Sequence, residues 1–397
     1  MKILFQCPKY LPDLGGIEIS TSKIAKELIQ RGHEVSVLCE KTSDSQKDFE
    51  IMEKVKVFRF LNNPLGKFFN FLNFQSLQIS LKKYGKKFYK ENKFDIIISR
   101  AFFFIKPTKQ IIPKTPLMYI QPSVGYIAMQ KSAENSPWIR KKISRYLKSL
   151  ISYSMEKRAL KNADRTLSRS KSMDQIIQKV FHSPKEKIGK FTQIANLKDF
   201  QPREKDAKLL EKLQIKNKKI VLTISRLSPD KNNLELIDIF KNTNPKNSVL
   251  LIVGGGSQEN EIKEKIKKLK MKNKIIMVGE QKNTKIYYNL ADIFVTTSKQ
   301  EGFPNVFLEA MASGIPIIGF KENPPEITIP TNEIIQSKKI GFAVKDKKEF
   351  SKKINILLKN GKLRNQMKQK AIEEVKKYSS KKICDNLLLE INKIMPK

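Results

Sequence analysis

Residues 291–320 (ADIFVTTSKQEGFPNVFLEAMASGIPIIGF) constrain the fold more than any other stretch of this chain. Residues 293–297 form a β-branched and aromatic run, which predicts a short strand. Pro304 then opens a predicted helix, because proline in the first turn loses no helical hydrogen bond. Gly314 ends that helix, and residues 315–320 are a second apolar run. A strand, a helix and a strand in this order predict a parallel α/β sheet.

The loop and first turn of this predicted helix carry groups that suit a ligand with phosphates and hydroxyls. A helix N-terminus presents free N–H groups and the positive end of the helix dipole. Glu301 and Glu309 bracket this terminus, and carboxylates accept hydrogen bonds from the paired hydroxyls of ribose and hexose rings. The spacing alone favours a blander interpretation, with Glu301 solvated in a loop and Glu309 on a helix surface, because such spacings often arise by chance.

Length and charge narrow the classes of protein that this chain can belong to. It has 397 residues, which suits two α/β domains better than one core. The net charge of +39 favours anionic partners, namely nucleic acid, acidic lipid headgroups or phosphorylated substrates. Three scattered cysteines argue for reduced thiols, and neither histidine lies in a metal-ligand pattern. With no evident secretory signal or membrane span, the predicted location is the cytoplasm.

The second half of the chain repeats the pattern of a buried strand followed by a polar loop. Residues 219–225 are such a strand, and the loop after it carries Arg226 and Lys231. This pair suits a diphosphate, because Arg grips two oxygens and Lys adds a point charge. In so lysine-rich a chain, the pair by itself favours a solvated basic turn. Gly254 and Gln281 each follow a further predicted strand, and the Gly254 run does not match a dinucleotide-binding motif.

The first half begins with the same kind of unit. A strand at residues 2–7 and a helix at residues 17–31 flank a loop that carries Gly15 and Gly16. Paired glycines let backbone N–H groups approach an anion, although a plain tight turn fits this motif equally well. Arg100 and Gln121 follow two further buried strands. Because open α/β sheets bind ligands outside the carboxyl ends of their strands, both are expected to line the crevice between the domains.

Residues 51–190 hold most of the basic excess of the first half, with 30 Lys and Arg against 8 Asp and Glu, a net charge of 30 − 8 = +22. Two segments within this region, 68–89 and 138–161, have apolar stripes flanked by basic residues. Such a segment can lie on an anionic membrane surface. It can equally pack its stripe on the sheet of its own domain. The sequence leaves both interpretations open.

Two strings resemble a known family. EGFPNVFLEAMASGIPII is similar to the signature of the retaining glycosyltransferase family 4, and SRLSPDKN to its diphosphate-binding loop. The resemblance implies a GT-B fold, in which two Rossmann-like domains face each other across a cleft. It implies an acceptor-binding domain at residues 1–202, a nucleotide-sugar-binding domain at residues 203–375, and a last helix within residues 376–397 that crosses back to the first domain.

The resemblance also implies roles for individual residues. Arg226, Lys231 and Glu301 would be catalytic, with the two cations at the departing diphosphate and Glu301 on the transferred sugar. The implied donor-binding residues are Gly15, Gly16, Arg226, Lys231, Gly254, Gln281, Glu301, Gly302, Phe303, Pro304, Asn305, Val306 and Glu309. Arg100 and Gln121 would lie on the acceptor side. Gln121 stands where the family commonly has histidine, and an amide can hydrogen-bond a hydroxyl but cannot titrate.

The expected function is therefore transfer of a sugar, with retention, from a UDP- or GDP-sugar to a glycan or lipid-linked acceptor in the synthesis of a cell-surface glycan, polysaccharide or lipid-linked oligosaccharide. No metal or other cofactor is expected, and the basic segments predict peripheral contact with the inner face of the cell membrane. Two alternatives come from other classes: a nucleotide-sugar epimerase of similar fold, and a nucleic-acid-binding protein, for which no recognised module accompanies the charge. A sugar-nucleotide binder without activity is a further alternative, given Gln121.

Overall fold

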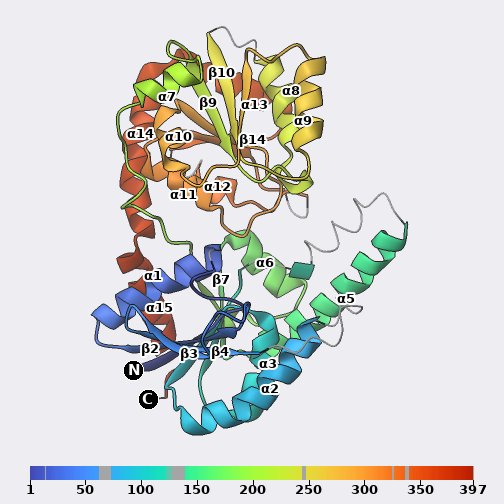
Figure 1. The fold of residues 1–397 in the computed structure, drawn as a ribbon, viewed down its shortest axis with the longest axis vertical. Helices are drawn as coiled ribbons and strands as arrows, with labels where there is room; N and C mark the ends of the chain where they lie inside the picture. The colour runs from blue at the N-terminus through green and yellow to red at the C-terminus, as the bar shows by residue number, and fades with distance from the viewer. Residues whose placement is uncertain are drawn as a thin grey trace. The chain divides into compact units, whose positions relative to one another are not determined.

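The computed structural model of the chain divides into two compact units, and each is built on one sheet with helices against it (Figure 1). The first unit holds Met1–Gln193 and Ser380–Lys397, and the second holds Ile194–Ser379. The structure describes residues 1–13, 15–61, 73–122, 125–126, 139–243, 247–323, 326–335 and 339–396.

The first unit has an eight-stranded sheet in the order β3-β4-β2-β1-β5-β6-β7-β8. Its strands are β1 (Lys2–Gln6), β2 (Glu34–Glu40), β3 (Phe49–Met52), β4 (Val55–Phe60), β5 (Ile96–Ser99), β6 (Leu117–Ile120), β7 (Arg165–Ser168) and β8 (Ile188–Lys190). Neighbours pair in parallel except for β3 with β4, which form an antiparallel pair at the edge. The central strands are apolar runs that are buried along their whole length, as expected when helices cover both faces of a parallel sheet.

The helices of the first unit are α1 (Gly16–Gln30), α2 (Asn73–Glu91), α3 (Phe102–Ile111), α5 (Ile139–Asn162), α6 (Lys171–Lys179) and α15 (Ser380–Asn392), with a 3₁₀ turn, η2, at Lys185–Lys187. Leu81 of α2, Phe104 of α3 and Leu160 of α5 meet in one core on the sheet. The final helix α15 belongs to this unit, where Asp385 pairs with Arg31 at 2.8 Å.

The second unit has a six-stranded, wholly parallel sheet in the order β11-β10-β9-β12-β13-β14. Its strands are β9 (Lys219–Ile224), β10 (Ser248–Val253), β11 (Ile275–Gly279), β12 (Ile293–Thr296), β13 (Ile317–Phe320) and β14 (Gly341–Val344). The chain builds outward from β9 to one edge and then returns to β12 on its other side. The strand order therefore reverses between β9 and β12, and ligands of open α/β sheets bind at such a reversal.

The helical layer of the second unit comprises α7 (Ala207–Lys212), α8 (Asn233–Asn242), α9 (Glu259–Lys268), α10 (Lys285–Leu290), α11 (Asn305–Ala312), α12 (Thr331–Ile334), α13 (Lys347–Lys359) and α14 (Gly361–Val375). Two 3₁₀ turns, η3 (Pro229–Lys231) and η5 (Lys376–Tyr378), complete it. Among the described residues, no helix is both long enough and apolar enough to cross a bilayer.

The strand–helix–strand unit predicted at residues 291–320 is confirmed as β12, α11 and β13, with Phe294 opposite Ile317 in parallel register. Gly314 ends the helix with a left-handed φ of +72°. One detail differs from the prediction. Pro304 is the N-cap of α11 rather than its first helical residue, and its carbonyl oxygen accepts the first turn bond from the N–H of Phe307. The extended backbone of Pro304 lets the loop arrive at the helix from a buried position.

Candidate functional site

The loops that follow β9 and β12 are joined to each other at the reversal of strand order. The buried hydroxyl of Thr297 donates to the carbonyl oxygens of Lys231 and Asn232, at 3.1 and 2.9 Å. The backbone N–H of Lys299 donates to the carbonyl oxygen of Asp230 at 3.2 Å. The two loops that carry the predicted catalytic residues of the second unit therefore form one backbone framework.

Within this framework the structure brings Lys231 and Glu301 together. The Lys231 ammonium forms an ion pair and hydrogen bond with Oε1 of Glu301, and both side chains are partly or largely buried. A second carboxylate, that of Asp230, lies 3.5 Å from the same ammonium. Because burial excludes water, the electrostatic attraction between these two side chains is stronger than in an exposed ion pair. The arrangement places a cation, which can bind a phosphate, beside a carboxylate, which can accept hydrogen bonds from sugar hydroxyls.

Asp230 is a member of this site that the sequence analysis did not single out. Its carboxylate accepts a hydrogen bond from the Ser228 hydroxyl at 2.6 Å and lies 4.0 Å from the guanidinium of Arg226, whose side chain is mostly exposed. Burial alone would raise the pKa of Asp230, but the Ser228 hydrogen bond and the charges of Lys231 and Arg226 together lower it. Asp230 is thus an anion between the two predicted cations. Its position directly before Lys231, within the cationic loop, was the signal that could have revealed it.

Glu309 on α11 is oriented by a partner from another helix. The buried Tyr288 of α10 donates its hydroxyl hydrogen bond to Oε2 of Glu309 at 2.7 Å. Burial, and then the negative charge of Glu309, raise the pKa of Tyr288 well above its usual value. Glu309 is therefore half-buried and held in one orientation, unlike a solvated residue on a helix surface. Tyr288 was not predicted, because nothing in its local sequence marks it as the partner of a residue 21 positions away.

The remaining residues predicted at the start of α11 divide between core and surface. Phe303 is buried in the main core cluster of the second unit, where its ring lies 5.5 Å from that of Tyr378. Pro304 is also buried, whereas Gly302 and Val306 are half-buried and Asn305 is exposed. Phe303 therefore anchors the loop in the core at the helix N-terminus.

Gly254 supports the Arg226 loop from the neighbouring strand. Its φ is +141°, and a Cβ at this position would lie 1.9 Å from the carbonyl oxygen of Ser225. The N–H of Leu227 donates to the carbonyl oxygen of Gly255 at 2.9 Å, which fixes the two turns against each other. Only glycine allows this approach. Gln281, after β11, is half-buried and donates its amide to the carbonyl oxygen of Val278 at 3.3 Å.

Gly15 and Gly16 lie at the start of α1 in the first unit. Gly15 is the N-cap, with an extended backbone, and Gly16 is the first helical residue. A Cβ on Gly15 would lie 2.3 Å from Oε2 of Glu18, so the Glu18 carboxylate folds back over the helix N-terminus. A carboxylate in this position interacts favourably with the helix dipole.

Arg100 and Gln121, which follow β5 and β6, are both buried in the first unit. The guanidinium of Arg100 donates to the hydroxyls of Ser20 at 3.0 Å and Thr21 at 3.4 Å, and it lies over the ring of Phe191. Burial lowers the pKa of Arg100. Gln121 is different, because neither polar atom of its amide has a hydrogen-bond partner among the described residues. A buried amide in that state is suited to a polar group supplied from elsewhere.

Glu156 is a further unpredicted polar group in the first unit. This buried residue of α5 accepts hydrogen bonds at Oε1 from the Tyr126 backbone N–H, at 2.9 Å, and from the Ser152 hydroxyl, at 2.8 Å. Burial raises the pKa of Glu156 to about 7, although these hydrogen bonds oppose the shift. The carboxyl group therefore holds the backbone of Tyr126 against α5.

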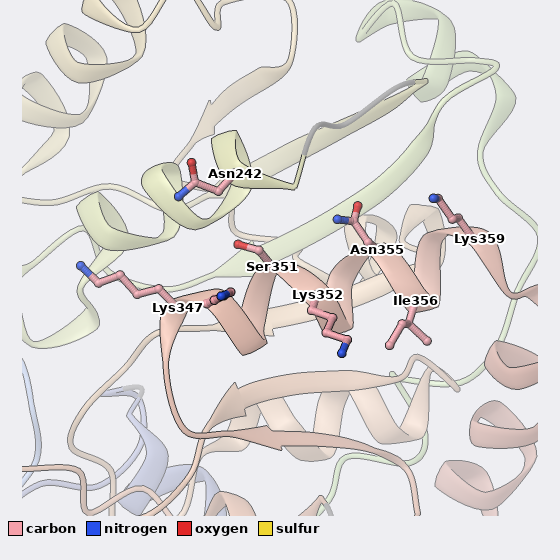
Figure 2. A pocket seen from close by; sticks show the side chains of 8 residues that line it. Asn242, Lys347, Ser351, Lys352, Asn355, Ile356 and Lys359 are labelled. Atoms are coloured by element: carbon pink, nitrogen blue, oxygen red, sulfur yellow. The ribbon is translucent and has the colours of Figure 1, made fainter.

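A cavity of about 670 Å³ lies away from these residues, against α13 and the end of α8 (Figure 2). It is lined by Asn242, Lys347, Lys348, Ser351, Lys352, Asn355, Ile356 and Lys359. Its lysines point in different directions in Figure 2, and Lys347 pairs with Glu235 at 3.0 Å. Divergent ammonium groups do not make an anion site, and none of the predicted residues lines this cavity. Nor does the described part of the chain contain a group of three His, Cys, Asp or Glu that could hold a metal ion.

Two family descriptions match the chain, one in each unit. The family described as Glycosyltransferase Family 4 matches residues 14–189, and the family described as Glycosyl transferases group 1 matches residues 205–374. The second match contains the loops after β9 and β12 and all of α11. Together the two matches cover most of the chain.

Individual proteins are similar over different lengths. The amylovoran biosynthesis glycosyltransferase AmsD of Erwinia amylovora is 32% identical over 162 residues, which are 40% of this chain and 44% of that protein, so the match spans less than half of that relative. A Campylobacter jejuni protein named N-acetylgalactosamine-N,N'-diacetylbacillosaminyl-diphospho-undecaprenol 4-alpha-N-acetylgalactosaminyltransferase is 24% identical over 329 residues, 82% of each chain. The structure of Anabaena HepE in complex with UDP-glucose has a TM-score of 0.72 at 19% identity and covers 99% of this chain and 100% of that chain.

Proposed function

The chain belongs to the glycosyltransferases of group 1 and family 4 and has their GT-B fold of two Rossmann-like domains, and we propose that it transfers a sugar, with retention, from a nucleotide diphosphate to an acceptor hydroxyl. The observation that carries this proposal is the paired Lys231 and Glu301 on the joined loops after β9 and β12. The Erwinia and Campylobacter relatives are both named as glycosyltransferases, which supports this proposal over an epimerase or a nucleic-acid-binding protein.

The donor would bind through its diphosphate at Arg226 and Lys231. On binding, the diphosphate would replace Glu301 as the partner of Lys231, which leaves the Glu301 carboxylate to accept hydrogen bonds from the hydroxyls of the sugar. Arg226 is exposed, and its guanidinium lies 4.0 Å from the carboxylate of Asp230, so it can turn onto the second phosphate. Glu309, oriented by its hydrogen bond from Tyr288, would accept hydrogen bonds from the hydroxyls of the ribose.

The catalytic step proposed is electrostatic. As the bond between the sugar and the diphosphate breaks, the acceptor oxygen bonds to the same sugar carbon and its proton passes to the departing diphosphate. The cations of Arg226 and Lys231 stabilise the negative charge that grows on this leaving group. Both cations come from one loop, which supports a reaction that does not need a metal ion. The N–H groups at the start of α11, near residues 303–306, would add further hydrogen bonds.

The expected donor is a UDP- or GDP-sugar, and the acceptor a glycan or a lipid-linked sugar at the inner face of the cell membrane. Anabaena HepE, whose fold is similar, was solved with UDP-glucose, which supports a uridine nucleotide. The Campylobacter relative carries diphospho-undecaprenol in its name, which supports a phosphorylated lipid carrier. The net charge of +22 over residues 51–190 suits such an acceptor.

A thermal-shift series tests the donor site. The full chain is heated with UDP, GDP, ADP and their sugars, together with the variants Glu309→Ala and Glu264→Ala. Glu264 is an exposed residue of α9 that serves as the matched control. A nucleotide at 100 times its dissociation constant stabilises the protein by about 2.7 kcal/mol. One nucleotide is expected to raise the melting temperature of wild type and Glu264→Ala, but not of Glu309→Ala. An equal shift in all three proteins, or no shift with any nucleotide, would refute the assigned site.

A further inference from the structure

The N-terminal half of helix α5 carries a row of large apolar side chains that the described structure leaves open to solvent. Ile143, Tyr146, Leu147 and Leu150 have exposed fractions of 56%, 50%, 55% and 46%. Residues three, four and seven positions apart lie on one face of a helix. These four residues, named the α5 face below, account for four of the ten large apolar residues recorded as exposed among the described residues.

The C-terminal half of α5 anchors the helix to the first unit. Met155, Ala159 and Leu160 are buried in the core that also contains α2 and α3. Ser149 and Ser152 are buried on the side of the helix opposite the α5 face, where Glu156 accepts the hydrogen bond from the backbone N–H of Tyr126. In Figure 1 the N-terminal end of α5 reaches away from the sheet of its unit. The α5 face therefore lies on a helix whose C-terminal half is packed in the core of the first unit.

Basic residues continue the α5 face toward the C-terminus of the helix. Lys161 follows Ile143 by 18 residues, which is five turns at 3.6 residues per turn, so the two lie on the same side. Lys157 and Arg158 flank that line, and all three basic side chains are exposed. The one acidic residue of α5, Glu156, is buried. The exposed side of the helix is thus apolar at one end, cationic at the other, and free of carboxylates along its described length.

We propose that the α5 face docks on a bilayer surface with anionic headgroups. The four apolar side chains enter the boundary between headgroups and acyl chains, and Lys157, Arg158 and Lys161 contact headgroup phosphates. This deepens the proposed function and rests on it, because an enzyme docked in this way meets an acceptor that is anchored in the same surface. An apolar row with a basic continuation matches a lipid surface better than a nucleic acid, since phosphates alone leave the apolar residues in water.

Helix α2, the other segment predicted to contact a membrane, differs from α5. Leu77, Leu81 and Phe88 of α2 are buried in the core of the first unit. Residues 68–72 of that segment, like Trp138 before α5, lie outside the described residues. Ile79 is 62% exposed, but no other exposed large apolar residue accompanies it on the described side chains of α2. Leu77, Leu81 and Phe88 thus pack α2 on its own domain, and the exposed Ile79 supplies a matched control.

The test is binding of the full chain to lipid vesicles, measured by co-sedimentation. Vesicles of phosphatidylcholine alone are compared with vesicles that also contain phosphatidylglycerol. Wild type is expected to bind the anionic vesicles at least about tenfold more tightly, because each basic residue near such a surface contributes about a fivefold gain. The double variant I143S/L147S should lose at least about tenfold in binding, through lost apolar burial. The variant K157S/K161S should lose a similar factor, and I79S should bind like wild type.

Several outcomes would overturn the proposal: equal binding to both vesicle types, no binding by wild type, or a loss in I79S as large as that in I143S/L147S. Sedimentation velocity covers another occupant. If wild type is a dimer that I143S/L147S converts to a monomer, a second copy covers the α5 face and the proposal is wrong. Because the substituted positions are exposed, unchanged melting curves confirm that each variant is folded.

The nucleotide thermal shift separates this proposal from the proposed function. I143S/L147S is expected to keep the full shift with the donor nucleotide while it loses vesicle binding. If the wild-type chain binds anionic vesicles but its melting temperature responds to no nucleotide, the proposed function is refuted and the docking surface is still supported. If the wild-type chain responds to a nucleotide but does not bind anionic vesicles, the docking surface alone is refuted.

Discussion

In the proposed function, Lys231 would serve both donor binding and catalysis. Its ammonium lies between the carboxylates of Glu301 and Asp230, so its charge is balanced until a diphosphate arrives. The ligand must compete with these carboxylates for the cation. A donor that fills both the phosphate and the sugar positions does so better than a simple anion, because it also supplies hydroxyls to the carboxylate that it displaces.

Substituting Lys231 with alanine is expected to lower kcat by about 10²–10³, the usual loss when one preorganised charge is removed from a transition state. The measurement is the rate of nucleotide diphosphate release from the donor identified by thermal shift. Lys299→Ala, at an exposed position on the neighbouring loop, is the matched control and should stay within about threefold of wild type. Equal losses in the two variants would show that general positive charge matters rather than the Lys231 position.

Glu156→Gln tests the buried carboxyl group of α5. The folded protein raises the pKa of Glu156 from 4.5 to about 7, so between these values it holds a proton that the unfolded chain releases. Stability from this group is therefore fully present below pH 4.5 and is lost as the pH rises through 7, by on the order of 3 kcal/mol. Glutamine does not titrate and keeps an acceptor for the Tyr126 N–H. The melting temperature of Glu156→Gln should exceed that of wild type by more at pH 8 than at pH 5, and a constant difference would contradict this.

At the scale of elements, the site depends on how three strand ends meet. The turn after β10 packs through glycine on the loop after β9, and that loop is hydrogen-bonded to the loop after β12. The apolar strands place these ends at one edge of the sheet, and the turns then fix the spacing of the functional groups. A substitution in one of these turns should therefore displace side chains on the other two loops, even where the substituted residue does not contact them.

Adjacent glycines of the turn provide a matched pair. Gly254→Ala would place a Cβ 1.9 Å from the carbonyl oxygen of Ser225 at a φ of +141°, so the Arg226 loop must move. We expect a loss of at least about 2 kcal/mol in stability and weaker nucleotide binding. A Cβ on Gly255 meets nothing closer than 3.4 Å, so Gly255→Ala should change stability by less than about 1 kcal/mol. Urea denaturation and the thermal shift measure both effects, and equal stability of the two variants would show that the contact is unimportant.

At the scale of the whole molecule, each unit has a core of its own, and the chain visits the first unit twice. Helix α15 packs four buried side chains on it, those of Ile383, Cys384, Leu387 and Ile391. Polar contacts add to this: Ser380 donates to Glu27 at 2.6 Å, and Arg165 pairs with Glu390. The first unit is therefore completed by a segment that is distant in sequence.

A chain that ends at Ser379 is expected to lose the unfolding transition of the first unit. Four buried side chains at about 1.5–3 kcal/mol each amount to roughly the whole stability of a domain. The transition of the second unit should remain, because its strands and core lie within Ile194–Ser379. Scanning calorimetry measures both, with a chain that ends at Asn392 as control. Persistence of both transitions in the shorter chain would show that α15 is dispensable.

Much of the architecture could be predicted because its signals are local. The apolar run that begins at Ile293 predicted strand β12, and Gly314 predicted the end of the helix that follows. The structure has both features. The pairings within the site could not be predicted in the same way. Asp230 lies beside Lys231 in sequence, but its hold on Arg226 depends on a loop conformation, and Tyr288 meets Glu309 only because α10 and α11 pack side by side.

The sequence by itself determined the two α/β units, the family, and the loops that carry the residues proposed for the site, because apolar periodicity, turn residues and short motifs act over a few residues. Only the tertiary structure decided where the side chains on those loops and helices point. It turned Arg100 inward onto Ser20, paired Lys231 with Glu301, and left the apolar row of α5 exposed while it buried Leu77, Leu81 and Phe88 of α2. The physical reason is that direction and burial are set by neighbours that are distant along the chain.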